Sequence, residues 1–222
     1  MSKILVVAPH PDDETLGCGG TILKHKSQGD EIVWLIVTDI LETEGFIAEK
    51  ITNRNHEIEI VAGLYGYDEV YRLSFPTTKL DVFPLGQIIE SISTVIRKEN
   101  PDIIYLPYRG DVHSDHKIVF DAVISCTKWF RYSSVKRVLC YETLSETDFG
   151  INPDYNGFRP NVFVNISDFM EKKIDIIKVY KSEMGDFPFP RSEQSIRALA
   201  MMRGSACGCN FAETFMLLKE IL

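Results

Sequence analysis

Two short polar segments carry the residue types that metal-dependent hydrolysis requires. In residues 4–20 (ILVVAPHPDDETLGCGG), an apolar run is followed by His10 and then by three consecutive acidic residues. The segment HSDH at 113–116 places two histidines three positions apart where a helix is expected to begin, so both side chains can face the same side. Ligands of the types histidine, aspartate and histidine with one open position match a catalytic zinc site, and the same set suits ferrous iron.

Both segments directly follow short apolar runs that predict buried strands. These runs are residues 4–8 and 102–106, and helical patterns begin soon after each of them. In a parallel sheet flanked by helices, ligands bind beyond the carboxyl ends of the strands. We therefore expect the loops 9–15 and 107–116 to lie at the same edge of the sheet, where their side chains can meet.

The rest of the chain repeats this alternation of strand and helix. Further strands are predicted at 31–38, 69–73, 135–142 and 162–166, and helices at 15–28, 48–64, 85–98, about 114–130, 168–182 and 193–203, while 212–222 fit either state. This alternation is typical of a parallel sheet with helices on both faces. We find no repeat and no linker, so we predict a single Rossmann-like, three-layer α/β/α domain with a mostly parallel sheet over residues 1–222.

The composition narrows the classes of partner and location. A net charge of −8 argues against a nucleic-acid binder, which needs a basic face to release counterions. No run approaches the ~18 apolar residues of a membrane-spanning helix, and residues 4–8 are too short for a signal sequence. We therefore expect no membrane insertion and a cytoplasmic location, and the sequence leaves a homo-oligomer open.

The cysteines and the two remaining histidines have simpler explanations. Five cysteines are an odd number, which favours reduced thiols, and we expect them as small buried side chains. Cys207 and Cys209 form a lone C-x-C, so a four-thiolate zinc site is not expected. His25 and His56 fall among charged neighbours in predicted helices, and we expect both on the surface.

The sequence resembles the PIG-L/LmbE family of zinc-dependent de-N-acetylases, which act on N-acetylglucosamine-containing compounds. The likeness rests on APHPDDETLGCGG near the start together with HSDH downstream. It continues through Arg54 and Glu57 on one predicted helix and through RSEQSIRALAMMRGSACGCNFAETF at 191–215, so it covers nearly the whole chain. The family often has HPDH in place of HSDH; serine is a good N-cap residue, so the same geometry is expected.

The resemblance implies a metal site and a general base. His10, Asp13 and His116 match the metal ligands, and Asp12 matches the base that takes a proton from water. A metal ion lowers the pKa of bound water towards ~7 and polarises the substrate carbonyl. The family therefore implies a Zn²⁺-dependent amidohydrolase, with Fe²⁺ as an alternative metal, acting on an acetylated amino sugar or its conjugate.

The resemblance also implies supporting residues. His113 matches the residue that stabilises the oxyanion or protonates the leaving amine, with Asp115 as its orienting partner. A carboxylate beside His113 would favour the imidazolium form and raise the pKa of that histidine. Arg54 is implied at the rim of the site, where it could bind substrate hydroxyls or phosphate, although an ordinary helix ion pair with Glu57 explains it equally well. Glu14 is expected to be a supporting carboxylate.

Other interpretations remain beside this one. GCGG at 17–20 lacks the third glycine of a dinucleotide-binding loop, so close packing of the first helix explains it better, and no G-x-S-x-G motif indicates a serine hydrolase. A hydrolase of another small amide and a non-catalytic sugar- or metal-binding module are alternatives, but pure binding leaves Asp12 without a role. Arg109 or Arg191 could bind a phosphate on the substrate. Five aromatic residues in predicted loops could stack on a sugar or merely pack those loops: Phe149, Tyr155, Phe158, Phe187 and Phe189.

Overall fold

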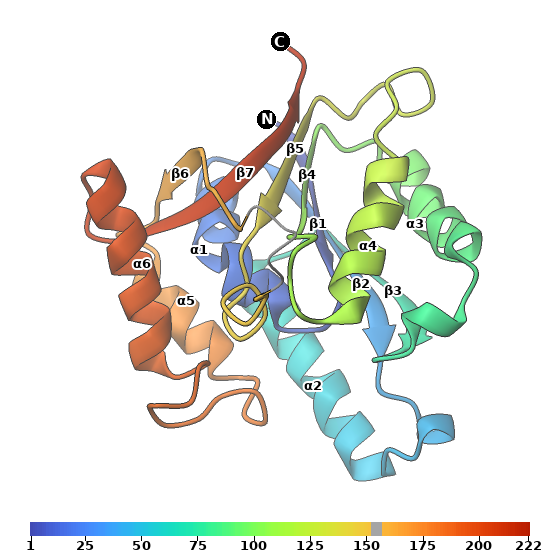
Figure 1. The fold of residues 1–222 in the computed structure, drawn as a ribbon, viewed down its shortest axis with the longest axis horizontal. Helices are drawn as coiled ribbons and strands as arrows, with labels where there is room; N and C mark the ends of the chain where they lie inside the picture. The colour runs from blue at the N-terminus through green and yellow to red at the C-terminus, as the bar shows by residue number, and fades with distance from the viewer. Residues whose placement is uncertain (152–156) are drawn as a thin grey trace.

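A seven-stranded sheet runs through the computed structural model, which describes residues 1–151 and 157–222 (Figure 1). The strands are β1 (Lys3–Ala8), β2 (Glu31–Asp39), β3 (Glu69–Pro76), β4 (Ile103–Pro107), β5 (Arg137–Tyr141), β6 (Val162–Asn165) and β7 (Ala212–Glu220). The α-helices are α1 (Asp13–Ser27), α2 (Ala48–Tyr65), α3 (Leu85–Glu99), α4 (Ser114–Ser125), α5 (Met170–Ile177) and α6 (Glu193–Cys207), with short 3-10 turns η1 (Glu42–Glu44) and η2 (Leu80–Val82). The predicted α/β class and mostly parallel sheet are confirmed.

The strand order β3-β2-β1-β4-β5-β7-β6 explains where a site can form. The first five strands in this order pair in parallel, and β7 runs antiparallel to both of its neighbours. The chain moves outward from β1 to β2 and β3, then returns to place β4 on the other side of β1. The loops after β1 and β4 therefore leave the sheet in different directions and open a crevice between them. These are the two loops that carry the motifs.

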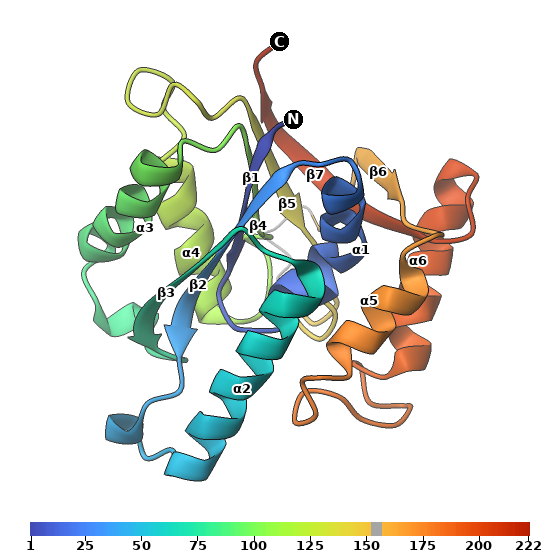
Figure 2. The same cartoon turned by 180° about the vertical axis from the view of Figure 1, so that it is seen from behind.

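Two layers of helices cover the sheet. Helices α3 and α4 lie on one face, and α1, α2, α5 and α6 lie on the other (Figures 1 and 2). Alternate residues of β1 pack into separate cores, with Ile4 and Val6 facing α1 and α2 and Leu5 and Val7 facing α3 and α4. A strand covered on both faces has no solvent side, which explains why this run is apolar throughout.

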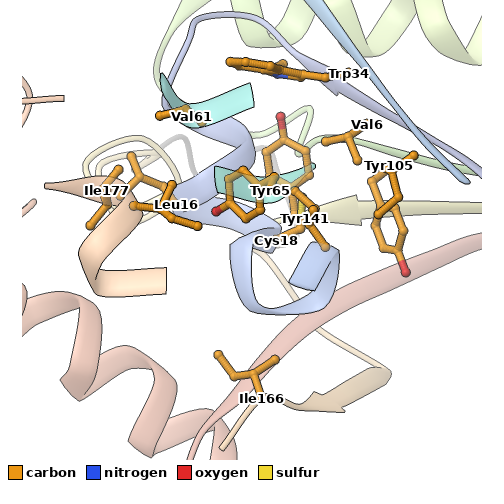
Figure 3. Packing of buried hydrophobic residues seen from close by; sticks show 14 of the residues in the cluster. Val6, Leu16, Cys18, Trp34, Val61, Tyr65, Tyr105, Tyr141, Ile166 and Ile177 are labelled. Carbon is orange, nitrogen blue, oxygen red and sulfur yellow. The ribbon is translucent and has the colours of Figure 1, made fainter. Parts of the chain in front are cut away.

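The small residues of GCGG allow α1 to lie close to the sheet. A Cβ atom on Gly17 would overlap the ring of Tyr141, and one on Gly20 would overlap Ile166. Figure 3 shows Tyr141 beside Cys18 at this contact. The structure thus supports close helix packing as the explanation of the glycines.

Several element boundaries and surface predictions differ from those expected. Helix α4 ends at Ser125 and α5 at Ile177, both earlier than predicted, whereas α6 continues to Cys207. The segment 212–222, left open between two states, contains the strand β7. His56 is exposed as predicted, whereas His25 is half-buried, and its ring bridges Asp30 at 2.8 Å and the Tyr105 hydroxyl at 3.0 Å.

The cysteines are only partly as expected. All five are free thiols, and Cys18, Cys126 and Cys140 are buried. Cys207 is exposed and Cys209 half-buried, so burial was wrongly predicted for this pair; Cys207 is the last residue of α6, and Cys209 follows the glycine cap at Gly208. Among the helices of residues 1–151 and 157–222, we find none with the length and apolar character needed to cross a membrane.

Candidate active site

The turn between β1 and α1 is strained at Asp12. Its φ of 136° lies in the left-handed region that only glycine adopts readily, a conformation that costs about 1–3 kcal/mol. Asp12 occupies the N-cap position of α1, yet its side chain makes no capping hydrogen bond. Its backbone N–H instead donates to Glu14 Oε2 at 3.0 Å, and its carbonyl accepts from Leu16 N at 2.9 Å. The carboxylate of Asp12 is thereby left available to the crevice.

Glu14 stabilises this turn by accepting the Asp12 backbone N–H. Its side chain is fully buried and accepts hydrogen bonds from the Thr15 hydroxyl at 2.6 Å and the Tyr180 hydroxyl at 3.1 Å. Burial raises the pKa of Glu14 to about 7, although the hydrogen bonds from the Thr15 hydroxyl and the Asp12 backbone N–H lower it. It therefore acts through the backbone of Asp12, in agreement with the predicted supporting role.

The buried ion pair between Lys173 and Glu213 stabilises α1 at an interruption after its first turns. The helix is interrupted at Cys18, whose φ and ψ are −143° and 21°. Lys173 Nζ donates to the Leu16 carbonyl at 2.9 Å and to Glu213 Oε1 at 2.7 Å. The Glu213 carboxylate accepts from the backbone N–H groups of residues 20 and 21 at 2.8 and 2.7 Å. The carbonyl left free before the break thus meets the positive charge of Lys173, and the N–H groups left free after it meet the negative charge of Glu213.

The two sequence motifs meet around Asp13. Asp13 Oδ2 lies 3.2 Å from His10 Nδ1 and 3.2 Å from His116 Nε2. One ligand atom from each of these residues lies within 4.8 Å of the others, and Asp13 and His116 are buried. The structure therefore brings the three predicted metal ligands together from loops about a hundred residues apart in sequence.

The second nitrogen of each histidine contacts a carboxylate. His116 Nδ1 lies 2.8 Å from Asp111 Oδ2, and His10 Nε2 lies 3.0 Å from Asp115 Oδ2. Burial lowers the pKa of His10, but the Asp115 and Asp13 carboxylates outweigh it and raise this pKa to about 9. The carboxylates around His10 therefore favour a positive charge beside its ring. Metal-binding histidines commonly use their other nitrogen in this way.

One atom tests whether the site fits a metal ion. His116 Nε2 is buried, and although it lies 3.2 Å from Asp13 Oδ2, it makes no hydrogen bond of suitable geometry to any residue that the structure describes. An orphaned buried nitrogen is costly unless a further partner takes its lone pair. This nitrogen points towards Asp13 and His10. The three residues together therefore form a set of donor atoms that fits a divalent metal ion.

A second group of three potential ligands, His10, His113 and Asp115, fits less well. The Asp115 carboxylate already accepts hydrogen bonds from the backbone N–H of Thr78 at 2.7 Å and of Leu80 at 3.3 Å, in addition to contacting His10. Its lone pairs are therefore largely occupied. We favour the group around Asp13, in which Asp115 positions a ligand.

The predicted rise in the pKa of His113 is wrong, because the raising effect of the Asp115 carboxylate is outweighed. His113 is the N-cap of α4, and its Nδ1 accepts the backbone N–H of Asp115 at 3.1 Å, while the Asp115 carboxylate lies 4.0 Å away. Burial, and then the neighbouring His10 and His116, lower the pKa of His113 to about 4. Because Nδ1 accepts a hydrogen bond, a neutral His113 carries its proton on Nε2.

Arg191 holds the carboxylate of Asp12. Its Nη1 lies 2.8 Å from Asp12 Oδ2 and 3.0 Å from Glu183 Oε2, and its Nε donates to Ser145 Oγ at 2.8 Å. Burial and the adjacent Asp13 raise the pKa of Asp12 well above its usual range, and Arg191 opposes that rise. Asp12 is thus a buried carboxylate with high proton affinity.

These side chains surround a pocket of about 180 Å³. It lies at the carboxyl edge of the sheet, where the loops after β1 and β4 diverge. The lining residues are His10, Pro11, Asp12, Asp13, Thr38, Asp39, Ile40, Arg54, Thr77, His113, Glu146, Glu183 and Arg191. A small polar pocket with buried carboxylates and histidines is suited to acid–base chemistry on a small ligand.

Comparison with known proteins identifies the family. The family model described as "PIG-L: GlcNAc-PI de-N-acetylase" matches residues 5–127. The chain belongs to the PIG-L family. Diacetylchitobiose deacetylase of Thermococcus kodakarensis is 30% identical to it over 229 residues, which cover 96% of this chain and 82% of that protein. The resemblance drawn from the two motifs is therefore confirmed.

Solved structures agree with this assignment. N,N'-diacetylchitobiose deacetylase from Pyrococcus horikoshii, complexed with its inhibitor MPG, has a TM-score of 0.79 at 26% identity and covers 98% of this chain and 84% of its own. A conserved protein from Thermus thermophilus has a TM-score of 0.80 at 26% identity, covering 100% of this chain and 97% of its own. The PIG-L fold thus extends over the whole chain.

Arg54 lines the pocket of this PIG-L protein, but all its nitrogens are engaged. Nη1 donates to the Pro11 carbonyl at 2.9 Å, Nη2 donates to Glu183 and Ser182, and Nε lies 3.3 Å from Glu57 Oε2. Arg54 therefore holds the turn before Asp12. Arg54 forms the predicted ion pair with Glu57 and also lies at the rim of the pocket, so both predicted positions agree with the structure.

Four polar residues of this site were not predicted as site residues. Asp111 lies in the loop before His116, where its position in an acidic motif loop could have indicated it. Arg191 was considered only as a phosphate ligand. Glu146 and Glu183 lie in loops without any motif, and no sequence signal marks them.

The aromatic residues proposed to stack on a sugar do not line the pocket where they are described. Phe149, Phe187 and Phe189 are exposed, and Phe158 packs against Tyr108. Tyr155 lies outside the described residues.

Proposed function

We propose that this PIG-L protein removes the N-acetyl group from an N-acetylglucosamine-type amino sugar or its conjugate. The observation that carries the proposal is the meeting of His10, Asp13 and His116 beside a pocket that is also lined by Asp12, a buried carboxylate outside the ligand set. The names of the two deacetylases for diacetylchitobiose support an acetylated glucosamine as the substrate class.

His10, Asp13 and His116 would hold a divalent metal ion, Zn²⁺ in the first place, with Fe²⁺ as the alternative. When bound, such an ion lowers the pKa of water towards ~7 and polarises an amide carbonyl. Asp115 and Asp111 keep His10 and His116 turned with one nitrogen towards Asp13. The chain thereby prepares the ligand atoms in advance.

Asp12 is the general base of the proposed reaction. Its carboxylate lies beside the ligand Asp13 and takes the proton of the attacking water, because burial and Asp13 increase its proton affinity. The bond from Arg191 keeps Asp12 Oδ2 in place while the charge of Asp12 changes. The same proton then passes from Asp12 to the departing amine, which leaves Asp12 ionised for the next cycle.

His113 acts as a hydrogen-bond donor. Its Nδ1 is held by a backbone N–H, so its Nε2–H is the group free to meet the oxygen on which negative charge develops. A preorganised donor of this kind stabilises the transition state without gaining or losing a proton. Of the two roles implied for His113, this arrangement supports oxyanion stabilisation.

A direct assay tests the proposal. The protein is loaded with Zn²⁺ or Fe²⁺, its metal content is measured, and N-acetylglucosamine and N,N'-diacetylchitobiose are supplied while free amine is quantified. We expect one metal ion per chain and release of amine and acetate. Stoichiometric metal without cleavage of any acetylated amino sugar would favour a binding module, and cleavage of other small amides alone would favour a different hydrolase. The cytoplasmic location and a homo-oligomer stay predictions.

A further inference from the structure

One carboxylate in the pocket has no assigned function and is only weakly partnered. Glu146 is about nine-tenths buried at 8% exposure and lines the pocket. Its Oε2 atom has no hydrogen-bond partner among the described residues, while Oε1 has only long contacts, 3.4 Å to Ser145 Oγ and 3.5 Å to Arg191 Nη2. A buried carboxylate whose nearest donors lie at 3.4 and 3.5 Å is costly, so its retention in the lining of a pocket points to a donor on the ligand.

The loop that carries Glu146 is held firmly. The Val112 backbone N–H donates to the Glu146 carbonyl at 3.1 Å, and the Glu146 N–H donates to the Thr143 carbonyl at 3.1 Å. Next to it, the Thr147 hydroxyl donates to Asp111 Oδ1 at 2.6 Å. Because Asp111 also positions His116, Glu146 is fixed relative to the proposed metal ligands.

The cations of the pocket are already paired. Arg191 contacts Asp12 and Glu183 closely and Glu146 only at 3.5 Å. Arg54 contacts Glu183 and Glu57. Neither guanidinium is free to bind a phosphate or carboxylate on a ligand, which removes the phosphate role considered for Arg191.

The pocket also has an excess of acids. Five carboxylates and two guanidinium groups line it, and Asp111 and Asp115 lie directly behind the histidines. The Arg72–Asp39 pair and a bound divalent cation offset only part of this charge. An anionic ligand would therefore be repelled, whereas hydroxyl and ammonium donors would find acceptors.

Resting on the proposed function, we infer that Glu146 accepts a hydrogen bond from a hydroxyl or ammonium group of the substrate, and that the pocket selects neutral or cationic amino sugars over those carrying phosphate or carboxylate. Glu146 is thus a specificity-determining residue. It acts on the part of the sugar beyond the amide that is cleaved.

Two matched substrates test this inference. N-acetylglucosamine and N-acetylglucosamine 6-phosphate differ only in the phosphate, and we expect kcat/KM to be about tenfold or more higher for the neutral sugar, mainly through KM. Added salt should narrow the difference, because it screens the repulsion. In Glu146→Gln, which keeps the side-chain volume, the preference should fall several-fold with metal content and melting temperature retained. Glu90→Gln removes one carboxylate from an exposed position on α3 and should leave the preference unchanged.

A binding measurement separates this inference from the proposed function. Calorimetry with glucosamine and glucosamine 6-phosphate needs no turnover, and we expect tighter binding of glucosamine to the metal-loaded protein. Amine release without a preference for the neutral sugar, or an unchanged preference in Glu146→Gln, would overturn the inference and leave the deacetylase intact. Preferential glucosamine binding without cleavage would uphold the charge selection and overturn the deacetylase. Absence of binding of either amine together with absence of cleavage would overturn both.

Discussion

Two buried polar clusters flank the first turns of α1, one at the break near Cys18 and one at the N-terminus of the helix, and they differ in how completely their groups are paired. At the break, Lys173 and Glu213 pair with each other and with the backbone groups of residues 16, 20 and 21. At the N-terminus, His116 Nε2 is left without a hydrogen-bond partner among the described residues, and Asp12 has a strained backbone.

This difference separates a structural cluster from a reactive one. A buried charge that is fully paired stabilises one arrangement of the chain, and it offers nothing to a ligand. Strained residues persist where the surrounding fold holds them in place, and they are concentrated at functional sites. The break cluster is one of the elements that hold the first turn of α1, and with it Asp13, in place.

Asp12→Asn should give the largest change in activity while sparing structure. The amide cannot take a proton from water, so we expect kcat to fall by about 10²–10⁴-fold with metal binding retained. Turnover of acetylated substrate and metal content by mass spectrometry measure the two effects. Asp121→Asn on the outer face of α4 is the matched control. Equal turnover in Asp12→Asn would contradict the assignment of the base.

Lys173→Met should produce the largest loss of stability. Removing one partner of a buried ion pair leaves Glu213 uncompensated, which costs about 3–5 kcal/mol of unfolding free energy. Urea unfolding measures this value. Lys178→Met breaks an exposed pair with Glu193, for which we expect about 0–1 kcal/mol. Similar losses of unfolding free energy in the two variants would show that the buried ion pair contributes no more to stability than the exposed one.

Asp115→Asn tests the correction made for this residue. Because its carboxylate holds His10, we expect metal affinity to fall by about 10–100-fold. Asp111→Asn, which loosens His116, should have an effect of the same size. Competition with a chelator of known affinity measures both. Unchanged metal affinity with reduced kcat in Asp115→Asn would instead support a role through His113.

The smallest effect is expected at a third polar cluster, near the edge of the sheet. Glu99 accepts from the Tyr71 hydroxyl at 2.5 Å and lies 3.1 Å from Lys3 Nζ. Burial raises the pKa of Glu99, but these partners outweigh it and lower the pKa below its usual range. The ionised form therefore stabilises the fold above the unfolded-state pKa, and this contribution is lost as the pH falls through the lower folded-state value.

Glu99→Gln should remove that pH dependence. We expect it to flatten the acid side of the stability curve by less than about 1 kcal/mol, because solvent screens the pair. Urea unfolding between neutral and acidic pH measures the change. A change in unfolding free energy of several kcal/mol would show that Glu99 contributes to stability as much as the buried Lys173–Glu213 pair.

Local patterns were sufficient for the framework of the molecule. The apolar runs at 4–8 and 102–106 and the helical periods after them predicted parallel strands and two loops at one edge, because such patterns depend on near neighbours. The motifs in those loops also identified the proposed ligands and the base. Helix ends were less accurate, since α4 and α5 stop without a strong signal in the sequence.

The sequence by itself thus determined the fold class and the residue types that meet at the carboxyl edge. Only the tertiary structure decided how they are paired: Asp115 with His10, Arg191 with Asp12, and Glu146 with no donor. The physical reason is that these contacts join residues as far as 179 positions apart, and their direction depends on a strained turn and a helix cap. No local pattern of residues specifies such a geometry.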